Sequence, residues 1–179
     1  LTTGSSMDSM RVTGRALSKN FGSLLDLMAD VSLRPAFPAE EVERQRAQRL
    51  GALLQQRENP AQVATQVSSA AYYGSRHPYG FSELGTETSV KGMTRDDMVG
   101  FWKAHFVPAN AALVVAGEIT MNELRALAEK SFGAWPRAEA PRATTGAPAP
   151  TSARLVIVDL PGAPQTQMAV IGAGAGRST

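Results

Sequence analysis

The sequence predicts an α+β protein, and three observations point to this class. Apolar residues recur at helical spacing in several segments between positions 17 and 132, most of them with recognisable start or stop signals. Shorter segments with strand-like patterns lie before them, after them and at 111–116. The composition, with 43% hydrophobic and 19% charged residues, is ordinary for a globular protein.

The first third of the chain is expected to form an extended segment and then two helices. Residues 1–16 alternate apolar and polar positions around Met10 and Val12, which predicts an extended segment. A helix follows over 17–33 and ends at Arg34-Pro35. The next helix, 39–57, carries glutamates in its first turn, which its dipole favours. Its surface is rich in arginine and glutamine over a thin apolar stripe, which favours a solvated, charged helix.

The middle of the chain alternates helices with turns. Asn59-Pro60 opens a helix over 61–73, and 74–92 is expected to be a loop that contains HPYG. Thr94 is a good N-cap for a helix ending near His105. The apolar run AALVVA at 111–116 predicts a buried strand, and Thr120 caps a helix over 121–132 that Gly133 closes.

A change of composition near position 135 predicts a domain boundary. Residues 1–134 are expected to be the C-terminal part of one domain, and 135–153 a linker rich in Pro and Ala. Two strands, 154–160 and 167–171, would open a second domain within 154–179. The chain is therefore interpreted as a fragment truncated at both ends.

Composition excludes several kinds of site. The absence of Cys excludes disulfides and thiolate metal sites, and fits either a bacterial cytoplasm or a periplasm. The net charge of +2 gives no basic patch for nucleic acid, and no apolar run approaches the roughly 20 residues that span a bilayer. His77 and His105 are expected to fix a loop and to end a helix. No H-x-x-x-H or H-x-x-E-H spacing occurs, so these histidines cannot form a two-His metal site on one helix.

An ordered set of segments resembles the pitrilysin/insulinase family of zinc metallopeptidases, in its processing-peptidase-like bacterial branch. The matching segments are LLDLMADVSLRPAFPAEEVERQR, NPAQVA, HPYGFSELGTETSV, FWKAHFVPANAALVVAGEI, LAEKSFGAWPR and VIVDLPGAPQTQ. The resemblance implies two-layer domains in which helices pack on a mostly antiparallel sheet, with two domains enclosing a peptide-binding chamber. It also implies that H-x-x-E-H, with two zinc-binding histidines and a general base, would precede this chain.

The resemblance places the third zinc ligand on the helix at 39–57. In active relatives it is a Glu, with a supporting Glu seven residues earlier. Laying the E-R-x-R start of that helix on Glu43–Arg46 puts Gln45 at the supporting position and Ala52 at the ligand position, so no catalytic or metal-binding residue is expected here. In the alternative, the register slips and Glu58 substitutes, but it lies about 120° away around the helix.

These departures predict a non-catalytic, pseudo-peptidase subunit that binds no cofactor itself, whereas its catalytic relatives use zinc. Its partners would be a homologous catalytic metallopeptidase subunit, in a heterodimer, and a peptide substrate. The peptide would add as a β-strand to an edge segment, Leu1, Thr2, Thr3, Gly4, Ser5 and Ser6. Two alternatives stay open, namely an active zinc metalloendopeptidase with ligands outside this chain, and a non-proteolytic scaffold subunit of the same fold.

Overall fold

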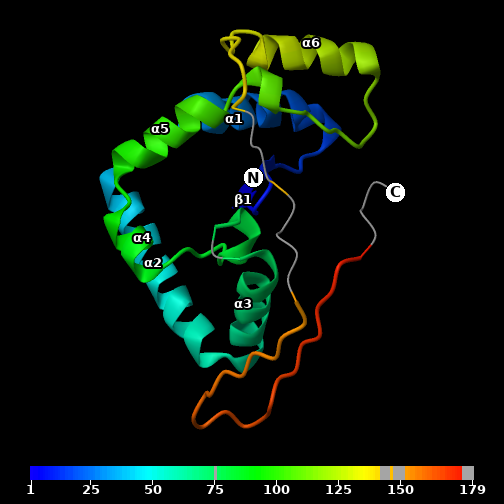
Figure 1. Ribbon diagram of the computed structural model, residues 1–179. Coiled ribbons are helices and arrows are strands. Elements are labelled where there is room, and N and C mark those ends of the chain that lie inside the picture. The colour runs from blue at the N-terminus through cyan, green and yellow to red at the C-terminus, as the bar shows by residue number, and fades with distance from the viewer. Residues whose placement is uncertain (75, 142–145, 147–151, 175–179) are drawn as a thin grey trace. The chain divides into compact units, whose positions relative to one another are not determined.

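The computed structural model describes residues 1–74, 76–141, 146 and 152–174. The chain divides into two compact units. Unit 1 comprises Leu1–Val42 and Met93–Ala143, and unit 2 comprises Glu43–Gly92 and Thr144–Thr179. The elements are β1 (Thr2–Ser5), β2 (Met10–Thr13), η1 (Ser18–Asn20), α1 (Phe21–Leu33), α2 (Ala39–Glu58), α3 (Pro60–Tyr73), η2 (Pro78–Gly80), α4 (Glu87–Gly92), α5 (Arg95–His105), η3 (Pro108–Asn110) and α6 (Met121–Phe132) (Figure 1).

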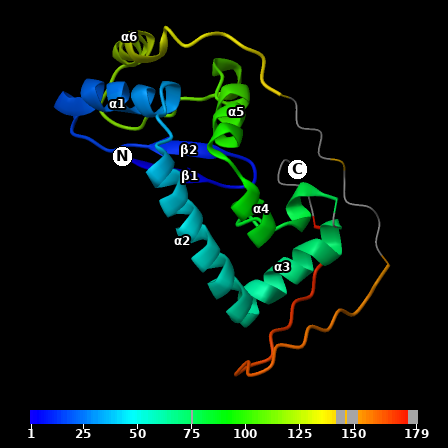
Figure 2. The same cartoon turned by 90° about the vertical axis from the view of Figure 1, so that its left-hand side faces the viewer.

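Unit 1 opens with a β-hairpin, which confirms the predicted extended segment. β1 and β2 pair antiparallel with Thr2 opposite Thr13 and Ser5 opposite Met10 (Figure 2). β2 leads to Gly14, which lies against the buried side chain of Leu24 on α1. A Cβ added at Gly14 would come within 2.6 Å of Leu24 Cδ1. The hairpin therefore packs closely on α1 at a position where only glycine fits without displacing a neighbour.

The core of unit 1 lies around α1, which also contacts α6. Leu25 and Ala29 on α1 are buried, as is Val107, which follows α5. Helix α5 is fixed to the end of α1 by the indole of Trp102, whose Nε1 donates to the carbonyl oxygen of Ser32 at 2.8 Å. This carbonyl lies in the last turn of α1, where the helix itself supplies no partner. The indole N–H thus supplies the hydrogen bond that the Ser32 carbonyl cannot receive within the helix.

Two capping boxes start α5 and α6 at the predicted threonines. In each, the threonine hydroxyl accepts from the third backbone N–H of the helix, and the acid there accepts from the threonine N–H. The hydroxyl and N–H of Thr94 lower the pKa of the Asp97 carboxyl, and those of Thr120 lower the pKa of Glu123. Both threonines were identifiable because the whole motif spans four consecutive residues.

The predicted strand at 111–116 does not form in the structure. Ala111 has extended backbone angles, yet 111–116 makes no ladder with the described residues, and Val114 is 87% exposed. The segments 154–160 and 167–171 are likewise not strands, and Leu155 is 85% exposed. A β-strand is held by hydrogen bonds to a neighbouring strand, so an apolar run alone cannot form one. The predicted boundary at 135–153 stays a prediction, and about half of that segment lies outside the described residues.

Unit 2 contains most of α2, then α3 and the segment that follows α3. Asn59 caps α3 as predicted, since its Oδ1 accepts from the backbone N–H of Ala61 at 3.0 Å and of Gln62 at 3.2 Å. Beyond α3 the chain turns at Gly74 (φ +84°) and returns through η2, where a Cβ at Gly80 would lie 2.2 Å from the Gly74 carbonyl oxygen. The short helix α4, which follows, lies where the sequence predicted a loop.

Candidate functional site

Helix α2 carries the two positions at which the resemblance expected acids. Gln45 is exposed and Ala52 is half-buried. At about 100° per residue, positions 45, 49, 52 and 56 fall in one stripe about 60° wide. Arg49 therefore lies between the two positions, about 6 Å along the axis from Gln45 and about 4.5 Å from Ala52.

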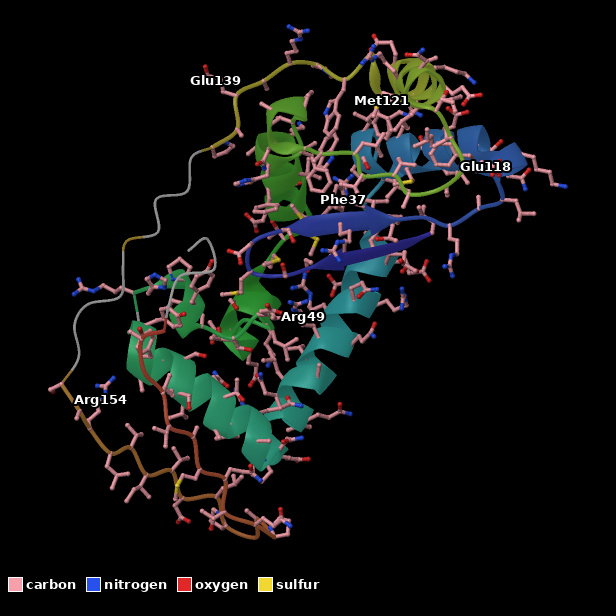
Figure 3. All side chains as sticks on the ribbon, turned by 90° about the vertical axis from the view of Figure 1, so that its right-hand side faces the viewer. Phe37, Arg49, Glu118, Met121, Glu139 and Arg154 are labelled. Carbon is pink, nitrogen blue, oxygen red and sulfur yellow. The ribbon has the colours of Figure 1, made fainter. Side chains whose placement is uncertain are left out.

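The two central arginines of α2 hold the segment 82–92 through its backbone. Arg49 donates from Nε to the Leu84 carbonyl oxygen at 3.2 Å and from Nη2 to that of Glu83 at 2.6 Å. Arg46 donates to the carbonyl oxygens of Val90 and Lys91. Figure 3 shows Arg49 on the side of α2 that faces this segment. We call Arg46 and Arg49 the α2 clamp.

Further polar contacts extend the same interface along α2. The side-chain amide of Gln56 exchanges hydrogen bonds with the Ser82 hydroxyl at 3.2 Å, and Arg57 pairs with Glu87 at 3.5 Å. Leu53 and Val90 are both buried. The interpretation of this helix as simply solvated and charged is thus wrong for this face. Arg46, Arg49, Gln56 and Arg57 bind the neighbouring segment, whereas other polar residues of α2, such as Gln45, are exposed.

Two carboxylates near the α2 clamp, those of Glu43 and Glu87, are paired with cations. Glu43 accepts two hydrogen bonds from Arg46, at 3.0 and 3.2 Å. These bonds, and the charge of Arg46, hold the pKa of the Glu43 carboxyl below its ordinary value. Lys91, and to a lesser extent Arg57, lower the pKa of Glu87 in the same way. These carboxylates are ionised partners of cations at neutral pH.

The side chains of this stripe do not fit a zinc ion. Zinc in proteins is bound by Cys, His, Asp or Glu, whereas Ala52 offers a methyl group and Gln45 an uncharged amide. The guanidinium of Arg49, between them, would repel a divalent cation. Across residues 1–74, 76–141, 146 and 152–174, no three His, Cys, Asp or Glu side chains are grouped in a way that could hold a metal ion.

Both histidines have structural partners, as their sequence contexts predicted. His77 Nδ1 accepts from the Tyr79 backbone N–H at 3.1 Å, and Nε2 lies 3.0 Å from the Gly146 carbonyl oxygen, to which it donates. The ring also stacks on Tyr73 at 4.9 Å. His105 ends α5 and stacks on the Phe101 ring at 4.2 Å. In these two hydrogen bonds, Nδ1 of His77 is the acceptor and Nε2 the donor.

The predicted peptide-binding segment, Leu1–Ser6, lies mostly in β1. All six residues are exposed, and β1 pairs with β2 along one side. In the described part of the chain, β1 has no second neighbouring strand. The arrangement leaves backbone groups of β1 available to another extended segment, and peptide binding there stays a prediction.

Comparison with known sequences identifies the family. A profile described as insulinase (peptidase family M16) matches residues 1–82, and a profile described as the peptidase M16 inactive domain matches residues 92–178. The chain belongs to the M16 peptidase family. The resemblance to the pitrilysin/insulinase group is thus confirmed.

Individual relatives of this M16 chain agree with that assignment. An uncharacterized zinc protease of Mycobacterium leprae is 31% identical over 109 residues, which cover 61% of this chain and 24% of the relative. The probable mitochondrial-processing peptidase subunit beta of Schizosaccharomyces pombe is 31% identical over 112 residues, covering 60% and 23%. A crystal structure of a peptidase M16 inactive domain from Pseudomonas fluorescens superposes with a TM-score of 0.67 at 26% identity, covering 74% and 32%.

The superposition also confirms the α+β fold class, in which helices accompany an antiparallel sheet. The M16 chain spans about a quarter of the length of these curated relatives and about a third of the solved chain. No helix of its described residues is both long enough and apolar enough to cross a membrane.

Proposed function

We propose that this chain belongs to a non-catalytic subunit of a zinc metallopeptidase complex. One observation carries the proposal. On α2, a methyl group (Ala52) and a neutral amide (Gln45) stand where the family resemblance expects two carboxylates, and the cationic side chain of Arg49 lies between them. Such a helix contributes no ligand to zinc and disfavours a cation nearby. The subunit would keep the peptidase fold but would not bind zinc or hydrolyse peptides itself.

The partner in this proposal is a homologous subunit that carries an intact zinc site. Membership of the M16 family supports this, as does the similarity to a protein named as a subunit of the mitochondrial-processing peptidase. The two subunits would enclose a chamber for peptides. A peptide would be held in it as an added β-strand beside Leu1–Ser6, through main-chain hydrogen bonds that do not depend on its sequence.

The test uses the protein at its full natural length. Purified alone, it is expected to contain far less than one zinc per chain and to leave a fluorogenic peptide uncleaved. Mixed with its homologous partner, it should raise the rate of hydrolysis above that of the partner alone, and a chelator should abolish the rate. Failure to form a complex, or a complex without any change in rate, would contradict the proposal.

A second candidate is an active zinc endopeptidase whose ligands all lie outside this chain. The relatives named as zinc proteases favour it. The same purified protein separates the two possibilities, because this candidate requires one zinc per chain and chelator-sensitive hydrolysis without any partner. A Glu58→Gln variant tests the separate alternative of a shifted register on α2, in which Glu58 would be a ligand and its loss would lower the zinc content.

A further inference from the structure

Arg49 of the clamp and the two missing acids belong to the same stripe of α2. Gln45 lies four residues before Arg49, and Ala52 lies three residues after it, so both are its neighbours on the helix surface. The guanidinium of Arg49 is directed to the Glu83 and Leu84 carbonyl oxygens through Nε and Nη2. What occupies positions 45 and 52 therefore decides which acceptors compete for these donors.

A carboxylate at either position would compete with the backbone carbonyls for Arg49. The bonds from the guanidinium to the carbonyls are already charge-assisted, and a carboxylate would add the attraction of opposite charges and an acceptor geometry that matches the paired N–H donors of Arg. A Glu at 45 would be placed for an i,i+4 pair with Arg49, and a Glu at 52 for an i,i−3 pair. Either pair would draw Arg49 back along α2 and away from 83–84.

The segment held by the clamp contains a short helix that is capped locally. Helix α4 has six residues, too few to be stable alone in water, although Thr86 and Ser89 cap its start. Its last carbonyls have no partner within the helix, and Arg46 binds those of Val90 and Lys91. A cation at this end also suits the helix dipole. Both arginines therefore add to the local bonds that order 82–92.

We propose that Arg46 and Arg49 are positioning residues that fix segment 82–92 against α2, and that the uncharged residues at 45 and 52 leave Arg49 free to do so. In a catalytic relative this face of α2 would bind the metal, whereas here it holds segment 82–92, which would form part of the wall of the peptide chamber. The placement of this segment in the chamber wall rests on the proposed function, whereas the clamp itself is a property of this chain.

Hydrogen exchange of the full-length protein tests the clamp directly. The amides of Gly85 and Val90 are suitable reporters, because they donate to Ser82 and Thr86 carbonyls at 2.9 Å within the clamped segment. In an Arg49→Ala variant, exchange of 82–92 should become about tenfold faster, while the rest of the protein is unchanged. Arg49→Lys keeps the charge but loses the two-pronged geometry, so it should fall between wild type and Arg49→Ala.

The competition is tested by a pair of amide-to-acid variants on α2. Gln45→Glu should accelerate exchange of 82–92 by about twofold, less than Arg49→Ala, because an exposed i,i+4 ion pair is weak. Gln55→Glu adds the same charge at an exposed position with no arginine three or four residues away, and it should leave exchange unchanged. Unchanged exchange in Arg49→Ala would overturn the clamp, and equal exchange in the two acid variants would overturn the competition.

The chamber wall has a separate readout in the complex with the catalytic partner. Arg49→Lys should raise the KM for peptide several-fold with little change in kcat, because the reacting groups belong to the partner. A fall in kcat at unchanged KM would overturn this role. If no active complex forms, the proposed function fails while the exchange results still decide the clamp.

Discussion

A Leu25→Ala substitution would test whether α1 is the platform on which the β1–β2 hairpin rests. Leu25 is 0% exposed, on a helix that contacts both β2 and α6. Truncating a buried leucine loses the transfer free energy of its side chain and leaves a cavity, at a cost of about 2–5 kcal/mol. We expect about 3 kcal/mol, a large fraction of the roughly 5–15 kcal/mol that stabilises a typical domain.

Leu27→Ala provides the matched control on the same helix. Leu27 is 58% exposed, so its truncation removes less buried area and opens no enclosed cavity, and should cost under about 1 kcal/mol. The change in helix propensity is the same in both variants and cancels in the comparison. Urea unfolding of the full-length protein, followed by circular dichroism, gives the two free energies of unfolding.

Native-state hydrogen exchange would show which residues Leu25→Ala destabilises. In Leu25→Ala, the amides of residues 1–33 should exchange faster, because the hairpin and α1 share this core. Binding of an extended peptide to the hairpin should weaken in parallel if Leu1–Ser6 is the binding edge. Equal destabilisation by the two substitutions would refute the assignment of Leu25 to the core of unit 1.

Three further outcomes follow from named contacts. Gly14→Ala should cost about 1–3 kcal/mol through overpacking, whereas Gly4→Ala, with open space around its Cα, should be nearly neutral in urea unfolding. Trp102→Phe keeps most of the aromatic surface but leaves a carbonyl of α1 without its donor, so thermal unfolding should report a loss of about 1–3 kcal/mol, and a neutral result would exclude that hydrogen bond. The pKa of the Glu123 carboxyl is lowered in the folded state, so its ionised form stabilises the protein above the unfolded pKa. This stabilisation should be lost as the pH falls through the lowered pKa. In acid titrations, the free energy of unfolding of a Glu123→Gln variant should therefore fall less steeply than that of the wild type.

The parts of the fold that the sequence predicted correctly depend on local interactions. Thr94, Thr120 and Asn59 start helices by binding backbone N–H groups two or three residues ahead, so the motif contains its own partner. The extended segment at 1–16 was predicted as well, although its folding into a hairpin, which pairs residues within a span of 12 positions, was not. Side-chain chemistry alone was therefore sufficient to place these elements.

The features that the sequence did not predict correctly depend on interactions between residues far apart in the chain. Helix α4 was missed although Thr86 and Ser89 cap it locally; its contact with Arg46, at Val90, lies 44 positions away and leaves no signal in the sequence of the helix itself. The clamp was missed for the same reason, since the acceptors of Arg49 are backbone carbonyls, which any residue type supplies. The strand expected at 111–116 depended in turn on a neighbouring strand that its own residues could not specify.

The close approach of Gly74 and Gly80 sets a limit on which sequences can replace HPYG. Any side chain at 80 would place its first carbon 2.2 Å from a backbone oxygen, which cannot rotate out of the way as a side chain can. A library that randomises 78–81 and is selected for folded protein should accordingly return glycine at 80 in nearly every survivor, while Phe81, about half exposed, should vary. The requirement for glycine at position 80 would then reflect the geometry of the backbone rather than a role in binding or catalysis.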